Sequence, residues 1–341
     1  MTRRVVVVGA GLASAAHLTA LRSLGAEVLG VVTRNPARAE AAQQYAPAAR
    51  ICSSISELTE LGADTGVVVT PPSTHLKVVS ELTAMGLDVI VDKPLAGSLR
   101  DAKAVADMAE ATGVRVAVSL QHRYKQAAME ARRMLSNNEI GALRSAVVTV
   151  PLWRPDSYYD EQGRGTWARD GGGVLMTQAI HTLDVYLSLT EPVTSVVAAG
   201  FTSRGRLEAE DTIHLILDHG GYAASVTAST ASWPGGTEAV HLYGDKGQLA
   251  VVGDSLTLTT EQTRSLVGGA VDASGPDPLA MAAWFEALYR DVFAQWSAGN
   301  DPMCEATSAL HVHQVIDAAY RSAAQSSRRI AIADRKEKPC P

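Results

Sequence analysis

The sequence predicts an α/β protein of two domains, with a parallel sheet in the first and a large, mostly antiparallel sheet in the second. Four consecutive valines, Val5–Val8, run directly into a glycine turn. Short apolar runs then alternate with helical stretches up to about residue 124, the pattern of a parallel sheet. From about residue 145 the strand-like runs follow one another through hairpin turns such as Gly220–Gly221, which predicts an antiparallel sheet.

The composition is that of a globular chain without a polyanionic or membrane partner. Its 341 residues are enough for two domains, and 46% of them are hydrophobic against 19% charged. The net charge of −6 gives no electrostatic reason to bind nucleic acid or an anionic membrane. No apolar run approaches the roughly 20 residues of a membrane span. We therefore expect no nucleic acid and no membrane among its partners.

The cysteines predict neither disulfides nor metal binding. The chain has three, Cys52, Cys304 and Cys340, which lie far apart and lack metal-ligand spacing. No other cluster of histidines and acids argues for a metal, so we expect none. A disulfide-free chain is typical of the reducing cytoplasm, which is the expected location.

The N-terminal glycine turn predicts a nucleotide cradle. The strand Val5–Val8 is β-branched throughout, and a helical stretch, Ala15–Leu24, follows the turn. Gly9 permits a tight turn, and Gly11 lets the backbone approach a pyrophosphate at the helix N-terminus. Ser14 stands where this fingerprint usually has Gly or Ala, and it is small enough to fit. The predicted cofactor-binding residues of the turn are Gly9, Gly11, Leu12 and Ser14.

The end of the second strand predicts a preference for NADP(H) over NAD(H). An NAD site usually has an acid here for the ribose 2′-hydroxyl, whereas Glu27–Val32 is followed by Thr33, Arg34 and Asn35. Arg34 and Arg38 are suited to pair with a 2′-phosphate. The alternative is that Arg34 covers the surface and stacks on adenine.

Three later strands of this half end in polar side chains, at the edge where parallel sheets bind ligands. The strands are expected over Gly66–Thr70, Asp88–Val91 and Val114–Ser119. Lys93 follows the second of them and precedes a proline, so its backbone is stiff. An ammonium there is able to lower the pKa of a substrate hydroxyl or relay its proton; the alternative is an ordinary surface lysine. The candidates for cofactor binding at these ends are Thr70, Pro71, His75 and Lys93.

A second candidate site begins at the glycine run Gly171–Gly173. A helix-like apolar pattern follows and carries His181, which is able to exchange a proton near neutral pH. On one continuous helix, Thr177 lies on the same face as His181. The aromatic segment Trp153–Trp167 suits a polyol ring, or else forms an interface or a packed loop. The predicted substrate contacts are Thr177, Gln178, Arg123, Tyr158 and Trp167.

The second half predicts the oligomerisation domain. After a helix at about 125–140, strands are expected at 145–152, 193–201, 212–217, 222–228, 239–243, 248–252 and 255–260, and helices at 282–297 and 306–326. The expected domains are 1–124 and 125–334, with a frayed tail at 335–341. One face of the sheet packs on helices, and the other invites association, so we expect a homodimer or homotetramer through it.

The motifs together resemble a known family. They are Gly9–Gly11 with His17, Thr70–Pro72 with His75, Asp92–Leu95, and Gly171–Gly173 through His181 and Asp184. In this order they resemble the glucose–fructose oxidoreductase, inositol dehydrogenase and MocA-like (Gfo/Idh/MocA) family, over essentially the whole chain.

The resemblance implies a Rossmann domain followed by an α+β domain whose open sheet packs against a partner subunit. It implies an NAD(P)-dependent oxidoreductase that acts on a sugar, sugar derivative or cyclitol, with Lys93 and His181 in proton transfer. The chain departs from the pattern twice. Asp92 replaces the common Glu before Lys-Pro, and Thr177 stands where many sugar and inositol dehydrogenases have Asp. Two alternatives stay open: a dehydrogenase of a non-carbohydrate cyclic alcohol or dihydrodiol, and a catalytically silent NADP-binding regulatory protein.

Overall fold

The structure, a computed structural model, describes residues 2–11, 13–267 and 281–332, which fall into two compact units. Among the described residues, the first unit comprises 2–11, 13–121 and 281–310. The second unit comprises 122–267 and 311–332. The sequence-based boundary after residue 124 is close to this division. However, helix α9 (Ala282–Ala298) groups with the first unit, where the sequence had assigned it to the second.

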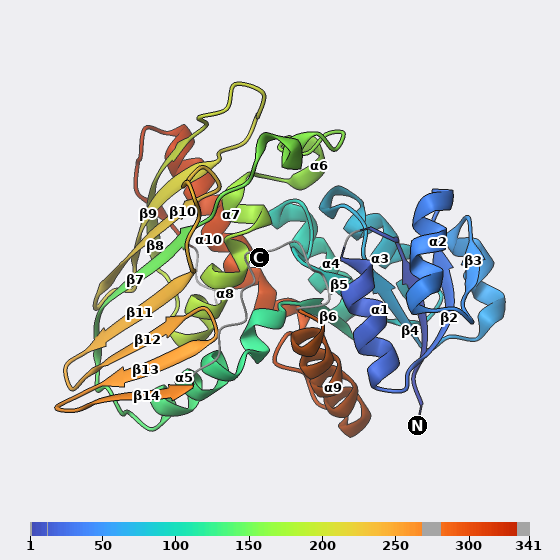
Figure 1. The fold of residues 1–341 in the computed structure, drawn as a ribbon, viewed down its shortest axis with the longest axis horizontal. Coiled ribbons are helices and arrows are strands. Elements are labelled where there is room, and N and C mark those ends of the chain that lie inside the picture. The colour runs from blue at the N-terminus through green and yellow to red at the C-terminus, as the bar shows by residue number, and fades with distance from the viewer. Residues whose placement is uncertain (1, 12, 268–280, 333–341) are drawn as a thin grey trace, which may run out of the picture. The chain divides into compact units, whose positions relative to one another are not determined.

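The first unit is built on a parallel sheet in the order β3-β2-β1-β4-β5-β6 (Figure 1). All of its neighbouring strands pair in parallel. Its strands are β1 (Arg4–Val8), β2 (Glu27–Val32), β3 (Arg50–Cys52), β4 (Thr65–Val68), β5 (Asp88–Asp92) and β6 (Val116–Ser119). The central strands are buried on both faces, because crossover helices cover both sides of a parallel sheet. The short strand β3 is absent from the sequence prediction, since three residues carry no periodicity.

The helices of this unit differ in how they begin, and a side chain caps two of them. They are α1 (Ser14–Ser23), α2 (Pro36–Tyr45), α3 (His75–Ala84) and α4 (Leu99–Thr112). Asn35 and Ser98 accept hydrogen bonds from the first turns of α2 and α4, as N-cap residues do. Helix α9 packs against α1 (Figure 1). Short connections, η1 (Ile55–Leu61), η2 (Pro72–Thr74) and η3 (Gln121–Tyr124), complete the chain up to residue 124.

The second unit is built on a sheet in the order β14-β13-β12-β11-β7-β10-β9-β8-β15. The β7–β10 pair is parallel, and the other neighbours are antiparallel. The strands are β7 (Leu143–Pro151), β8 (Ser195–Phe201), β9 (Thr212–Asp218), β10 (Ala223–Ser229), β11 (Ala239–Gly244), β12 (Gln248–Val252), β13 (Ser255–Thr259), β14 (Thr263–Val267) and β15 (Ile330–Ala331). The expected large, mostly antiparallel sheet is confirmed, with β14 and β15 additional to the prediction.

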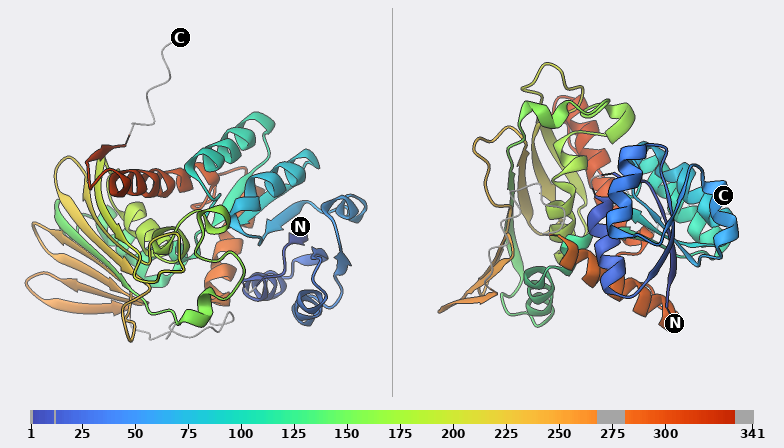
Figure 2. Two further views of the ribbon diagram at one scale, coloured as in Figure 1. Left: turned by 90° about the horizontal axis from the view of Figure 1, so that it is seen from above. Right: turned by 45° about the vertical axis from the view of Figure 1, so that its right-hand side comes forward.

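One face of this sheet carries the core of the unit. Helices α5 (Gln126–Ser136), α8 (Ile180–Leu189) and α10 (Ala306–Ala324) lie over it (Figure 2). Buried apolar side chains of all three helices belong to the same core as those of the sheet. Strand β9 shows the alternation clearly, because Ile213, Leu215 and Leu217 are buried while His214 and Ile216 are exposed. That period of two leaves the opposite face of the sheet outside the core.

The glycine run does not open into one helix. Helix α7 (Val174–Thr177) ends, and α8 starts at Ile180 after a break at Gln178 and Ala179. The prediction that residues 177 and 181 share a face of a continuous helix is therefore wrong. The amides of Gln178 and Ala179 both donate to Val174 O, so the chain turns tightly at this point instead of continuing. The short helices η4 (Asp156–Tyr159) and α6 (Trp167–Asp170) precede the run.

No helix in the described ranges is both long and apolar enough to cross a membrane. The expected tail, 335–341, lies outside the described residues, as does Leu12 of the glycine turn.

Candidate functional site

The glycine turn after β1 has a shape that only glycine allows. Gly9 has φ +104°, and a Cβ there would lie 2.3 Å from the carbonyl oxygen of Val69, so any other residue would be strained and would clash. Ser14 Oγ donates to Gly11 O at 2.6 Å, which folds the turn onto the first residue of α1. The backbone N–H groups at this helix start provide an anion site.

The end of β2 presents Arg34 to solvent. Asn35 Oδ1 accepts from Arg38 N at 3.2 Å, and Asn35 N donates to Thr33 Oγ1 at 3.3 Å. These bonds use the polar side chains of Thr33 and Asn35 to shape the start of α2. Arg34 itself is exposed.

His75 joins two loops of the first unit. Its ring is fully buried, with Nε2 2.8 Å from Thr70 O and Nδ1 2.9 Å from Pro94 O. Burial lowers the pKa of His75, so the neutral ring donates one hydrogen bond to a carbonyl. The contacts place His75 as a brace between the loop at Thr70 and Pro71 and the loop that follows Lys93.

Asp92, the residue before Lys93, is held by a chain of buried groups. His17 Nε2 lies 3.5 Å from Asp92 Oδ1, and His17 Nδ1 lies 2.6 Å from the Tyr289 hydroxyl. Burial raises the pKa of Tyr289 well above its usual value, so its hydroxyl stays protonated. Because the Asp92 carboxylate only accepts hydrogen bonds, the ring proton of His17 belongs on Nε2, and the hydroxyl then donates to Nδ1. Burial alone would raise the pKa of Asp92, but His17, Lys93 and His75 together lower it. Lys93 therefore follows a carboxylate that stays ionised.

Sequence reasoning missed Tyr289, because it lies on α9, nearly the whole length of the chain from His17. The aromatic and aliphatic pattern of α9 indicates core packing, and nothing in it marks one hydroxyl as a partner for a histidine.

In the second unit, a buried carboxylate holds the glycine run. The backbone N–H groups of Gly173 and Leu175 each donate to Glu210 at 3.0 Å, and the Tyr320 hydroxyl donates at 3.1 Å. A Cβ on Gly172 would lie 2.2 Å from the Tyr320 hydroxyl, and one on Gly173 would lie 1.8 Å from Glu210 O. The run is therefore glycine because Glu210 and Tyr320 approach its backbone so closely.

Three of the predicted substrate contacts lie together in one pocket. The lining of this pocket includes Tyr158, Thr177, Gln178 and also Arg164. Arg164 Nη1 donates to the Tyr158 hydroxyl at 2.9 Å, and Gln178 Nε2 donates to the same oxygen at 3.0 Å. Since two donors point at this oxygen, its own proton is directed elsewhere. Thr177 Oγ1 contacts Gly173 O at 2.6 Å and also Gln178 Oε1.

The other two predicted contacts lie apart from that pocket's lining. Arg123 is buried and forms a bidentate ion pair with Asp184, at 2.7 and 2.6 Å, so Asp184 holds the Arg123 side chain in place. Trp167, at the start of α6, is 45% exposed and packs edge-on against Tyr320. A substrate contact by either residue stays a prediction.

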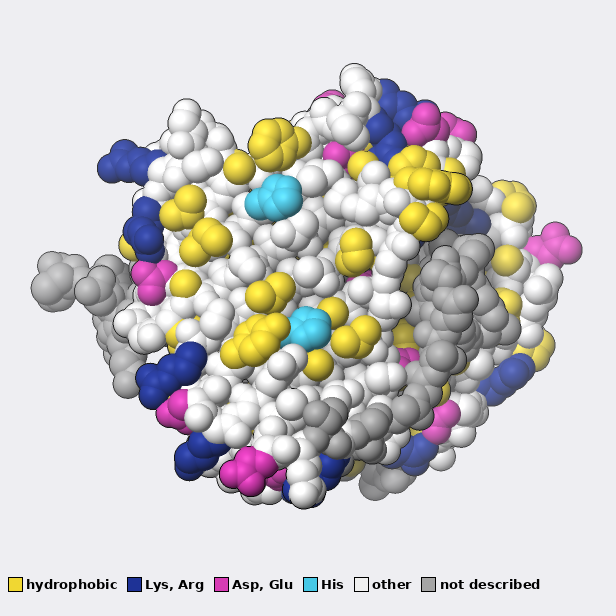
Figure 3. Space-filling model, turned by 60° about the vertical axis from the view of Figure 1, so that its left-hand side comes forward, with side chains coloured by type: hydrophobic (Ala, Val, Ile, Leu, Met, Phe, Trp, Pro, Cys, Tyr) yellow, Lys and Arg dark blue, Asp and Glu magenta, His cyan; other side chains and the backbone are white. Residues whose placement is uncertain are grey.

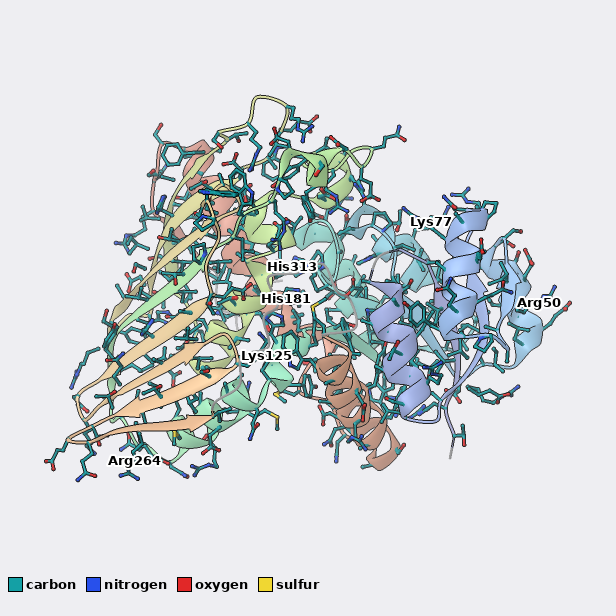
Figure 4. All side chains as sticks on the ribbon, in the orientation of Figure 1. Arg50, Lys77, Lys125, His181, Arg264 and His313 are labelled. Atoms are coloured by element: carbon teal, nitrogen blue, oxygen red, sulfur yellow. The ribbon has the colours of Figure 1, made fainter. Side chains whose placement is uncertain are left out.

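His181 is the second residue of α8 (Figure 4). Its ring stacks against that of His122, with centroids 4.3 Å apart and planes at 22°. Within the described residues no group of three or more His, Cys, Asp or Glu side chains is arranged to hold a metal ion.

Two family models match the chain. The oxidoreductase family model with an NAD-binding Rossmann fold covers residues 3–120, and the GFO/IDH/MocA C-terminal domain model covers residues 128–250. The chain belongs to the Gfo/Idh/MocA family. The expected fold class, a Rossmann domain followed by a domain with a large antiparallel sheet, is confirmed with it.

Three proteins that are similar to this chain are dehydrogenases by name. A myo-inositol dehydrogenase, Hyg17, from Streptomyces leeuwenhoekii is 29% identical over 197 residues, which span 58% of each chain. A D-apiose dehydrogenase from Paraburkholderia graminis is 25% identical over 93% of this chain and 86% of its own. The WlbA dehydrogenase of Bordetella pertussis, solved with NADH and UDP-GlcNAcA, superposes with a TM-score of 0.85 at 26% identity, over 98% of both chains.

The first unit of this Gfo/Idh/MocA chain fits the family's nucleotide. At Gly11 a Cβ would meet Val69 O only at 3.9 Å, so the backbone there is open to a ligand, and the start of α1 offers backbone N–H donors to a diphosphate. A nicotinamide dinucleotide is therefore compatible with the residues present.

Glu210 gives a pH-dependent prediction. Burial raises its pKa from 4.5 to about 7, so the folded chain retains a proton that the unfolded chain has lost. As the pH rises from the unfolded pKa of 4.5 to the folded pKa of about 7, the free energy of unfolding therefore falls, by up to about 3 kcal/mol in total. Glu210→Gln removes this titration, so from pH 5 to pH 8 the free energy of unfolding of the variant rises relative to wild type, as urea denaturation measures. The exposed control Glu60→Gln keeps the wild-type pH dependence. Equal pH dependence in Glu210→Gln and wild type contradicts the prediction.

Proposed function

We propose that this chain transfers hydride between NADP(H) and a secondary alcohol or ketone of a sugar, sugar derivative or cyclitol. One observation carries the proposal: in a chain matched by both family models, Lys93 follows β5 beside a carboxylate that stays ionised. An ammonium in that setting is suited to bind a substrate oxygen. The named dehydrogenases of inositol and apiose indicate the class of substrate.

Lys93 and His181 divide the proton transfer in this proposal. Lys93 donates a hydrogen bond to the reacting oxygen and stabilises negative charge on it. His181 takes the hydroxyl proton during oxidation and returns it during reduction. A bound nicotinamide supplies the hydride acceptor or donor.

Thr177, Gln178 and Tyr158 are proposed to bind the substrate hydroxyls. The Tyr158 hydroxyl already accepts from Arg164 and Gln178, so its proton is available to a substrate oxygen. Thr177 brings no charge where many relatives place a carboxylate. That difference also favours a second candidate, oxidation of a non-carbohydrate cyclic alcohol or dihydrodiol, which needs fewer hydroxyl contacts.

The preference for NADP(H) rests on the end of β2. Arg34 is exposed there, and no acid stands among residues 33–35 to hold a ribose 2′-hydroxyl. A guanidinium is suited to pair with the 2′-phosphate that distinguishes NADP.

Association through the open face of the second sheet is part of the proposal. Phe201, Ile216 and Tyr243 lie on this face and are 59%, 46% and 37% exposed. Figure 3 shows hydrophobic and histidine side chains spread over it. Such a surface favours a homodimer or homotetramer. Buried free thiols at Cys52 and Cys304 suit the reducing cytoplasm.

Lys93→Met tests the proposed chemistry. The variant keeps the length of the side chain but loses the ammonium, so kcat with NADP+ and a cyclitol or sugar panel should fall by at least about a hundredfold. Cofactor affinity, measured by fluorescence titration with NADPH, should change little. Lys77→Met on α3, at a side chain that is 83% exposed, is the matched control and should retain wild-type turnover. Normal turnover in Lys93→Met would overturn the proposed role of Lys93.

Tight NADPH binding with no turnover in wild type would support the regulatory alternative.

Cofactor preference is tested by steady-state kinetics with both nucleotides. We expect kcat/KM to be higher with NADPH than with NADH, and Arg34→Ala to lose about tenfold or more with NADPH while changing little with NADH. Arg50→Ala, at another exposed arginine of the first unit, serves as the control. A wild-type kcat/KM that is equal or higher with NADH would refute the preference.

A further inference from the structure

The second unit places a second imidazole directly against His181. The rings of His122 and His181 stack at 4.3 Å between centroids. His122 is well buried, with 11% of its side chain exposed. Two positive charges at this separation repel strongly where solvent is largely excluded. The stacked pair therefore holds one proton much more readily than two.

A carboxylate lies on the His122 side of the pair. Glu238 Oε2 is 4.0 Å from His122 Nδ1, and the same oxygen accepts a hydrogen bond from the hydroxyl of Thr182, the residue after His181. Thr182 thus fixes the direction of the carboxylate. Glu238, His122 and Thr182 line one pocket, and the anion favours a positive charge on the His122 ring.

Two charged residues that closely follow His122 in the chain have partners of opposite sign. Lys125 Nζ lies 3.2 Å from Asp254 Oδ1 (Lys125 is labelled in Figure 4), and Arg123 is paired with Asp184. These two ion pairs largely cancel their own fields. Thr177, on the far side of the helix break, brings no charge to His181. Glu238 is the carboxylate that the described contacts place beside the stacked rings.

We propose that His122, backed by Glu238, is a positioning residue that keeps His181 neutral and able to accept a proton from the alcohol substrate. The first proton to bind the pair goes to His122, beside the carboxylate. His181 then takes up a proton only at lower pH, because a cation already faces its ring. The role of His181 as the base rests on the proposed function. The charge arrangement itself does not rest on it.

The test compares His122→Phe with wild type in the full chain. Phe preserves the ring stack and removes the charge. The titration of His181 is followed by NMR of the ¹⁵N-labelled imidazoles, with His181→Asn identifying the signal. We expect the titration midpoint of His181 to move upward by at least about one pH unit, a tenfold change in proton affinity. His122→Gln should give the same shift if the Phe ring disturbs packing. His214→Gln, on the exposed face of β9, should leave the midpoint unchanged.

An unchanged midpoint in both His122 variants would overturn the inference. The kinetic readout separates it from the proposed function. If His181 is the base, the acid limb of kcat/KM for alcohol oxidation moves to higher pH together with the NMR midpoint. If the midpoint moves and the limb does not, the charge coupling stands, and the proposed role of His181 falls.

Discussion

The candidate site of the second unit depends on one buried carboxylate. Glu210 accepts hydrogen bonds from two amides of the glycine loop and from the Tyr320 hydroxyl. A hydrogen bond of this kind contributes about 0.5–1.5 kcal/mol net, and leaving its buried partner unpaired costs about 1–3 kcal/mol. The loop it fixes leads into α7 and α8. From Gly173 the contacts continue through Thr177 and Gln178 to the Tyr158 hydroxyl. A single acidic residue thereby determines where three proposed substrate contacts lie.

In the first unit, buried hydrogen-bonding groups of another kind hold the residue before Lys93. There a neutral tyrosine fixes the tautomer of His17, and His17 faces the carboxylate of Asp92. The side chain of His17 is fully buried and that of Asp92 is 16% exposed, so this contact lies in the interior of the unit. In both units the residues proposed to handle protons follow backbone that is held by buried hydrogen bonds. This rigidity is what proton transfer at fixed geometry needs.

The sequence predicts the fold well because its signals are local. Valine runs, glycine turns and hairpin turns mark most strands of both sheets, and the glycine turn at Gly9 and Lys93 follow from their place after strands. What the sequence does not show are contacts between distant segments. Glu210 and Tyr320 explain Gly172 and Gly173 through close approach, and Tyr289 meets His17 from the far end of the chain. The break between α7 and α8 was missed because the apolar pattern continues across it while the backbone turns at Gln178.

Amide hydrogen exchange at the glycine loop tests the central claim most directly. Gly173 and Leu175 donate their amide hydrogens to Glu210, so both amides should exchange slowly in the wild-type chain. In Glu210→Ala both should exchange at least about tenfold faster, which corresponds to a loss of about 1.4 kcal/mol. The amide of Ala198, which donates to Ser322 Oγ in the same unit, should keep its rate. Unchanged exchange at Gly173 and Leu175 in this variant would contradict the account.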